Sequence, residues 1–240
     1  MRSFALTVTL LAATLGAASF ASNWTVISSF DGPYPTYGYG IEAYGNYLYC
    51  ASGPASSAIY VITTTGSVVS SYAVIMPPYD LDFDGTYFWV VHTNHYCRRY
   101  TSTGSALSSF SIGSINGWGI AYDGTYIWLK GNVSTDYIYR MSTTGSIYSS
   151  FACPAAGESG LDYAGGYLWN PSRVSSVVYK TTTAGSVVDS FTGPATWSFG
   201  STWDGAYFWT TNQANGWVYK MQDVQDVAPA SLGKVKALYR

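Results

Sequence analysis

The chain has 240 residues, of which 10% are charged and 18% aromatic, and its formal net charge is −2. Soluble domains carry about 25% charged residues, and 11 basic against 13 acidic residues leave no positive surface for nucleic acid. A hydrophobic fraction of 48% argues against a disordered chain, and the many Tyr, Trp, Thr and Val residues favour an all-β fold.

The first 21 residues are expected to be an export signal. A short basic start at 1–3 precedes an apolar run at 4–18, and the S-F-A at 19–21 fits the small-x-small pattern before a cleavage site. The apolar run is shorter than the roughly 20 residues that a membrane-spanning helix needs. The mature chain is therefore predicted to be secreted, in the extracellular space, in the periplasm or at the cell surface, without a membrane span.

A repeat of about 40 residues follows the signal. Its first motif, of the type D-G-T-Y-I-W, occurs five times, and a second motif, of the type T-T-G-S-V-V-S-S-Y, follows each of the first four copies. Asp-Gly and Thr-Gly suit tight hairpin turns, so each repeat is interpreted as four short strands. The glycines of the first motif are Gly45, Gly85, Gly124, Gly165 and Gly205.

A period near 40 with four strands per repeat is typical of a propeller blade. The fifth repeat lacks its fourth strand, and residues 23–30 match the missing one. The sequence therefore predicts an all-β, five-bladed β-propeller of four-stranded antiparallel blades over 22–221, closed by the N-terminal strand. The blades are expected near 39–74, 79–112, 118–153, 159–193 and 199–221 plus 23–30.

The pattern D-G-T-Y-x-W…x-Y-K/R…T-T-G-S-x-x-S-S-F over 23–221 resembles the broad superfamily of NHL, Kelch and WD-repeat-like propellers, and is most similar to secreted bacterial repeats. The resemblance implies a fold but no activity, since propellers host many unrelated functions. Bacterial-type glutaminyl cyclases and some lectins are similar in blade number. This chain has no N-E-L-E-like or A-N-x-W-like segment of the cyclases and no lectin motif.

Cys50, Cys97 and Cys153 are an odd number of thiols for an oxidising compartment. They lie at non-equivalent places of the repeat, and there is no C-x-x-C motif. One disulfide with a free thiol and no disulfide at all both stay open, and small buried side chains are the favoured interpretation.

Loops that differ between the repeats are the candidate binding surface. Four aromatic residues at equivalent positions are expected around the mouth of the central channel, where only Ser159 breaks the series. Aromatic rings can stack on sugars or hold peptide side chains, and packing between loops is the alternative. The candidate ligand-binding residues are Tyr37, Tyr39, Tyr79, Trp118, Trp197, Phe199, His92 and His95.

The polar residues of these loops offer further alternatives. His92 and His95, with Asp80 or Glu158, can supply an acid and a base, although exposed histidines without a role are the preferred interpretation. Basic residues outside the repeated positions, the signal and the tail are few. They are Arg98, Lys130 and Arg173.

Three carboxylates share one position on the strand that lines the channel, namely Glu42, Asp82 and Asp162. Three such groups can coordinate a cation, but hydrogen bonding to the backbone within the ring is favoured. No metal site and no cofactor are predicted, and no residue is identified as catalytic.

We therefore expect a secreted, monomeric, non-catalytic binding or adhesion propeller that recognises a glycan or an extracellular protein and binds no nucleic acid. A propeller enzyme, a lyase or hydrolase working through loop His, Asp and Glu, is one alternative. The other is a structural component of an extracellular assembly that uses the basic tail at 222–240, where Ser231 can cap a short helix.

Overall fold

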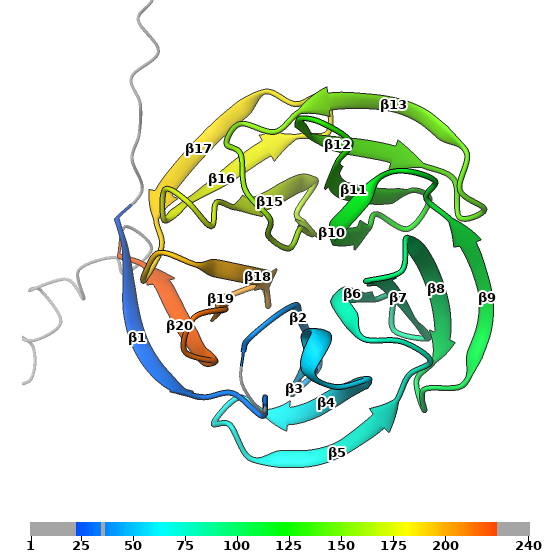
Figure 1. Ribbon diagram of the computed structural model, residues 1–240. Helices are drawn as coiled ribbons and strands as arrows, with labels where there is room; N and C mark the ends of the chain where they lie inside the picture. Colours follow the sequence, from blue (N-terminus) through cyan, green and yellow to red (C-terminus); the bar gives the residue numbers. More distant parts are fainter. Residues whose placement is uncertain (1–22, 35–36, 225–240) are drawn as a thin grey trace, which may run out of the picture.

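The computed structural model describes residues 23–34 and 37–224. The predicted export signal and nearly all of the predicted tail lie outside these ranges. The described residues form five four-stranded antiparallel sheets that surround one axis (Figure 1). The prediction of an all-β, five-bladed propeller is confirmed.

In the first four blades the strands follow chain order from the axis to the rim. Blade 1 comprises β2 (Ile41–Tyr44), β3 (Tyr47–Ala51), β4 (Ala58–Thr63) and β5 (Val68–Ala73), with the short 3-10 helix η1 (Gly53–Ala55) between β3 and β4. Blade 2 comprises β6 (Pro78–Phe83), β7 (Tyr87–His92), β8 (Tyr96–Thr101) and β9 (Ala106–Ser111). Blade 3 comprises β10 (Asn116–Tyr122), β11 (Ile127–Asn132), β12 (Asp136–Met141) and β13 (Ile147–Ala152). Blade 4 comprises β14 (Asp162–Ala164), β15 (Tyr167–Pro171), β16 (Val177–Thr182) and β17 (Val187–Thr192).

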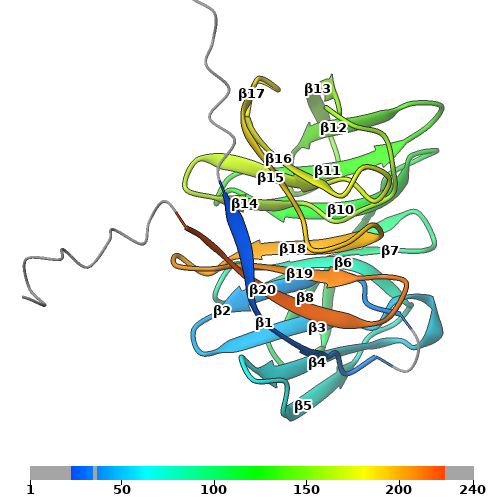
Figure 2. The ribbon, with the colours of Figure 1, turned by 90° about the vertical axis from the view of Figure 1, so that its left-hand side faces the viewer.

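Blade 5 joins the two ends of the propeller. It consists of β18 (Ser198–Trp203), β19 (Phe208–Asn212), β20 (Trp217–Asp223) and, at the rim, β1 (Trp24–Asp31). β1 runs antiparallel to β20, with Trp24 opposite Asp223 and Phe30 opposite Val218, and the two strands lie side by side in Figure 2. The predicted closure by the N-terminal strand is confirmed.

The D-G-x-Y-x-W motif builds its turn from its own aspartate. In blade 3, Asp123 Oδ1 accepts hydrogen bonds from the backbone N–H groups of Thr125 and Tyr126, at 2.8 and 2.7 Å. Its other oxygen accepts the indole N–H of Trp128 at 2.7 Å. Gly124 has a φ of +91°, which L side chains rarely adopt. The motif therefore fixes the turn and the buried tryptophan together.

The repeated basic residues pack on the aromatic rings beside these turns. Arg140 lies 3.7 Å from the ring centroid of Tyr126, and Lys220 lies 3.6 Å from that of Tyr207. Such cation–π contacts stabilise the junction between turn and strand. Most of the repeated charges therefore belong to the fold.

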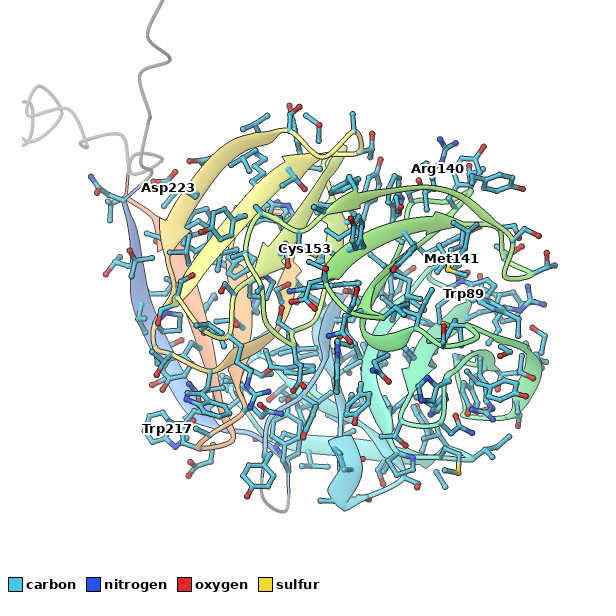
Figure 3. All side chains as sticks on the ribbon, turned by 45° about the horizontal axis from the view of Figure 1, so that its top comes forward. Trp89, Arg140, Met141, Cys153, Trp217 and Asp223 are labelled. Carbon is cyan, nitrogen blue, oxygen red and sulfur yellow. The ribbon has the colours of Figure 1, made fainter. Side chains whose placement is uncertain are left out.

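The cysteines contribute to packing. Cys50 and Cys97 are buried, Cys153 is half-buried, and all three are free thiols; Cys153 is labelled in Figure 3. This agrees with the favoured interpretation of small buried side chains. Within the described ranges, no helix has the length and apolar character needed to cross a bilayer.

Candidate functional site

The innermost strands approach so closely that they close the axis. Four blades have glycine at one equivalent position, and a Cβ added to Gly200 would lie 2.5 Å from the Tyr39 carbonyl oxygen. Backbone contacts this close leave no room for a side chain. The ring consists of Gly40, Asp80, Gly119, Gly160 and Gly200.

Asp80 is the one side chain in this ring, and it connects several blades. Its Oδ2 accepts the backbone N–H groups of Ile120 in blade 3 and Leu161 in blade 4, both at 3.0 Å. Its Oδ1 is buried without a hydrogen-bond partner, and the residue is only 1% exposed. Burial raises the pKa of this carboxyl well above its ordinary value. Asp80 therefore closes the channel and is not accessible as a general base.

The three channel carboxylates also link neighbouring blades. Asp82 accepts the backbone N–H of Tyr122 at 2.6 Å, and Asp162 accepts that of Trp203 at 2.9 Å. Both bonds are of the backbone type that the sequence analysis favoured.

Glu42 differs from the other two because its partner is a side chain. Its Oε2 accepts the hydroxyl of Thr202 at 3.0 Å. Burial raises the pKa of Glu42 and Asp162 well above the ordinary range and that of Asp82 to about 7. Among the residues that the structure describes, no group of three His, Cys, Asp or Glu side chains is placed to hold a metal ion.

The four aromatic residues of the channel mouth do lie together. Ring centroids are 4.9 Å apart for Phe199 and Tyr39, 5.8 Å for Tyr39 and Tyr79, and 4.8 Å for Tyr79 and Trp118. Phe199 and Tyr39 are buried, however, while Tyr79 and Trp118 are half-buried. Most of their surface is therefore used in packing against one another.

The two histidines are not the exposed pair that the sequence suggested. His92 is 1% exposed, its Nδ1 lies 2.8 Å from the Met76 carbonyl oxygen and its Nε2 lies 3.0 Å from the Tyr100 hydroxyl. Burial lowers the pKa of His92 to about 4. The half-buried His95 lies 2.9 Å from the Ile115 carbonyl oxygen. The expectation of exposed histidines is wrong for His92, because the end of β7, which carries it, packs against the chain before β6.

One cavity, of about 380 Å³, has Glu42 and Asp82 in its lining. A further open space is a groove formed by loops of blades 3, 4, 5 and 1. It consists of two adjoining cavities of about 390 and 520 Å³ that share Arg173 and Trp197. We call it the Trp197 groove. Its other lining residues are Tyr37, Tyr39, Gln213 and Ala214 in the smaller cavity, and Asn132, Asp136, Gly157, Glu158, Val174 and Thr196 in the larger one.

Trp197 is held in place through its backbone. Its φ of +69° is uncommon for a residue other than glycine. Its N–H donates to the Arg173 carbonyl oxygen at 3.0 Å, and its carbonyl oxygen accepts the Gln213 N–H at 2.9 Å. The side chain nevertheless stays 44% exposed. The exposed indole is therefore carried by a backbone that two hydrogen bonds hold.

A charged pair lies against this indole. The Arg173 guanidinium is 4.0 Å from the Trp197 ring centroid and donates a hydrogen bond to a Glu158 carboxylate oxygen. In the larger cavity, Asp136 accepts the Asn132 amide at 2.9 Å and the Gly157 N–H at 2.6 Å. The groove therefore combines a flat apolar face with hydrogen-bond donors and acceptors of both charges.

Sequence reasoning identified part of this set. Tyr37, Tyr39 and Trp197 were predicted as ligand contacts, and Glu158 belonged only to the alternative acid–base set with the histidines. Arg173 and Gln213 also line the groove and were not among the predicted ligand contacts, although Arg173 is one of the few basic residues outside the repeated positions.

The comparisons with known proteins support the fold. No family model and no curated protein matches the sequence. A glutaminyl cyclase from Myxococcus xanthus superposes with a TM-score of 0.69 at 12% identity, over 83% of this chain and 95% of that one. A catalytically inactive virginiamycin B lyase from Staphylococcus aureus with quinupristin gives 0.52 at 15%, over 83% and 99%. A Bacteroides thetaiotaomicron protein of unknown function gives 0.53 at 11%, over 84% and 72%.

Identities this low show a shared fold alone. The solved structures with this fold include enzymes of different chemistry, a cyclase and a lyase. The chain is thus a five-bladed β-propeller with structural neighbours in several propeller families, as the resemblance of its repeats implied.

Proposed function

We propose that this chain is a secreted, non-catalytic propeller that binds a glycan in the Trp197 groove. The observation that carries the proposal is the exposed indole of Trp197, fixed by its backbone and placed beside the Arg173–Glu158 pair.

The groove matches the chemistry of a sugar ring. The apolar C–H face of a pyranose stacks on an indole or phenol ring, and Trp197 and Tyr37 are 44% and 49% exposed. Sugar hydroxyl groups need both donors and acceptors close to that face, and Arg173, Gln213 and Glu158 supply them. A few polar groups around an apolar surface are the usual composition of a small-ligand site.

The groove offers less to catalysis. Burial displaces the pKa values of Asp80 and His92, but both residues are buried and do not line the groove. The acidic groups that do line it, Glu158 and Asp136, already accept hydrogen bonds from Arg173, Asn132 and Gly157. These contacts favour binding over proton transfer.

Glycan binding is tested with Trp197→Ala on a glycan array, followed by titration of the strongest hits. Loss of a central aromatic contact should weaken binding by at least about tenfold. Trp217→Ala is the matched control, because Trp217 (labelled in Figure 3) is 39% exposed and does not line either cavity of the groove. Wild-type protein that binds no glycan, or equal affinities of Trp197→Ala and wild type, would contradict the proposal.

Secretion rests on the predicted export signal at 1–21. We expect the mature protein to begin at Ser22 and to be recovered outside the cytoplasm. N-terminal sequencing of the fractionated protein tests this, and an intact Met1 in the cytoplasmic fraction would argue against it.

A further inference from the structure

Three residues that differ from their equivalents in the other blades lie together between blades 3 and 4, which are neighbours in the ring (Figure 1). They are Lys130, Ser159 and Asn170. At the position of Lys130 the other blades have Ala51, Val91, Pro171 and Thr211. At the position of Ser159 they have Tyr39, Tyr79, Trp118 and Phe199, and at that of Asn170 they have Cys50, Val90, Leu129 and Thr210.

Lys130 forms hydrogen bonds with both Ser159 and Asn170. Its Nζ donates to Ser159 Oγ, to Asn170 Oδ1 at 2.7 Å and to the Pro171 carbonyl oxygen at 3.2 Å. Lys130 and Ser159 are 0% exposed, and Asn170 is 1% exposed. None of the three acceptors is a carboxylate. A buried ammonium without an anionic partner is unfavourable for stability, so this cluster is not explained by the needs of the fold.

The acceptors of Lys130 lie next to the charged residues of the Trp197 groove. Ser159 directly follows Glu158, and Pro171 lies two residues before Arg173. The Ser159 hydroxyl also donates to the Pro171 carbonyl oxygen, so the two segments are joined to each other as well as to Lys130. One side chain from β11 thus holds both segments of blade 4 that carry the ion pair.

A paired lysine and serine can also serve as a base and a nucleophile. Here both side chains are fully buried, neither lines a cavity of the groove, and the serine hydroxyl donates to a carbonyl oxygen. We call this hydrogen-bonded group of Lys130, Ser159, Asn170 and Pro171 the Lys130 clamp, because it joins two segments of the chain.

We propose that Lys130 is a positioning residue of the Trp197 groove, which holds the segments 157–159 and 170–173 so that Glu158 and Arg173 face the ligand together. The relevance of this clamp to a ligand rests on the proposed function. Its effect on the two segments does not, and can be measured without any ligand.

The clamp is expected to weaken in alkali. Burial lowers the pKa of Lys130 to about 8, and a neutral amine has two hydrogens for three acceptors. The titratable groups that face it are Cys153, Asp136 and Asp80. Burial raises the pKa of Cys153 to about 11 and that of Asp80 well above its ordinary value. A variant without the Lys130 amine keeps these three groups, so comparison with the wild type isolates the effect of Lys130 titration.

The test is hydrogen exchange of the backbone amides in 157–161 and 172–175, in wild type and Lys130→Met. Because hydrogen bonds from a charged donor are lost, we expect about tenfold faster exchange in both segments of the variant at pH 6.5. After correction for intrinsic rates, wild-type protection should fall between pH 7 and 9.5, and it should fall more than the protection of Lys130→Met, in which only the other groups titrate. Val91→Ala, at the equivalent position of blade 2, is the control for a general loss of stability and should leave both segments unchanged.

Ser159→Ala is a milder second variant if Lys130→Met does not fold, and it should speed exchange in the same segments. Unchanged exchange in either folded variant, or the same pH dependence in Lys130→Met and wild type, would overturn the clamp. On the glycan array, Lys130→Met should weaken the glycans that Trp197→Ala weakens, and equal affinity would overturn the link to the groove. A wild-type protein without glycan binding would instead remove the proposed function, while the exchange result stands.

Discussion

The turn aspartates show how much a single exposed residue contributes to this fold. Asp204 is exposed, but its Oδ2 accepts the indole N–H of the fully buried Trp209 at 2.7 Å. Its Oδ1 accepts the N–H groups of Ala206 and Tyr207, at 2.8 and 2.7 Å. The same side chain thus satisfies a turn and a buried donor that has no other acceptor.

Asp204→Ala should therefore destabilise the protein by about 1–3 kcal/mol, because the Trp209 N–H is left buried without a partner. For a chain of this size, 1 kcal/mol corresponds to roughly 2–4 °C in melting temperature. Thermal denaturation followed by circular dichroism measures the shift. Asp31→Ala, an exposed aspartate at the end of β1, is the control, and equal shifts for the two variants would show that Asp204 has no special role.

At the scale of elements, the strands were predictable and the site only partly so. Asp-Gly turns and a constant period set the strands locally, which is why blades and closure followed from the sequence. The Trp197 groove depends on loops from four blades, and nothing near Arg173 in the chain indicates that Glu158 and Trp197 lie beside it. His92 was misjudged for the same reason, since its burial depends on a distant segment. Asp80 stands where the other four blades have glycine. The sequence shows this difference, but its meaning becomes clear only from the close approach of the inner strands in the structure.

At the scale of elements, we predict that the protein depends on β1, the strand that closes the ring, for its stability. Trp24 stacks on Phe191 of blade 4 at 4.5 Å and lies 5.6 Å from Trp203 of blade 5, so β1 connects two blades. Trp24 is partly buried, so its loss costs part of the roughly 3–5 kcal/mol that truncation of a fully buried aromatic side chain costs. Deleting 22–30 also exposes the edge of β20. We expect this deletion to lower the melting temperature by more than roughly 10 °C.

The control is Val26→Ser on the same strand, which is 41% exposed and should melt like wild type. A deletion variant that melts with the wild type would mean that β1 does not hold the ring together.

At the scale of the whole molecule, the buried carboxyl groups determine how stability depends on pH. The pKa of Asp82 rises from its ordinary 3.8 to about 7, and the pKa values of Glu42, Asp80 and Asp162 rise as well. A carboxyl with a higher pKa in the folded chain binds its proton more tightly there. Its contribution to stability is complete below the unfolded pKa of about 4 and is lost as the pH rises through the folded value.

His92 acts in the opposite direction. Its pKa falls from 6.5 to about 4 on folding, so its contribution grows as the pH rises between these values. The shift of Asp82 alone is larger than that of His92, and three further carboxyls add to it. The protein should therefore melt several degrees higher at pH 5 than at pH 8, because each 1 kcal/mol changes the melting temperature by roughly 2–4 °C.

Asp82→Asn keeps an oxygen for the Tyr122 N–H and removes the titration, so it should reduce this difference, whereas the exposed Asp31→Asn should leave it intact. A melting temperature that rises from pH 5 to pH 8 would mean that the carboxyls around the axis titrate as they do in water.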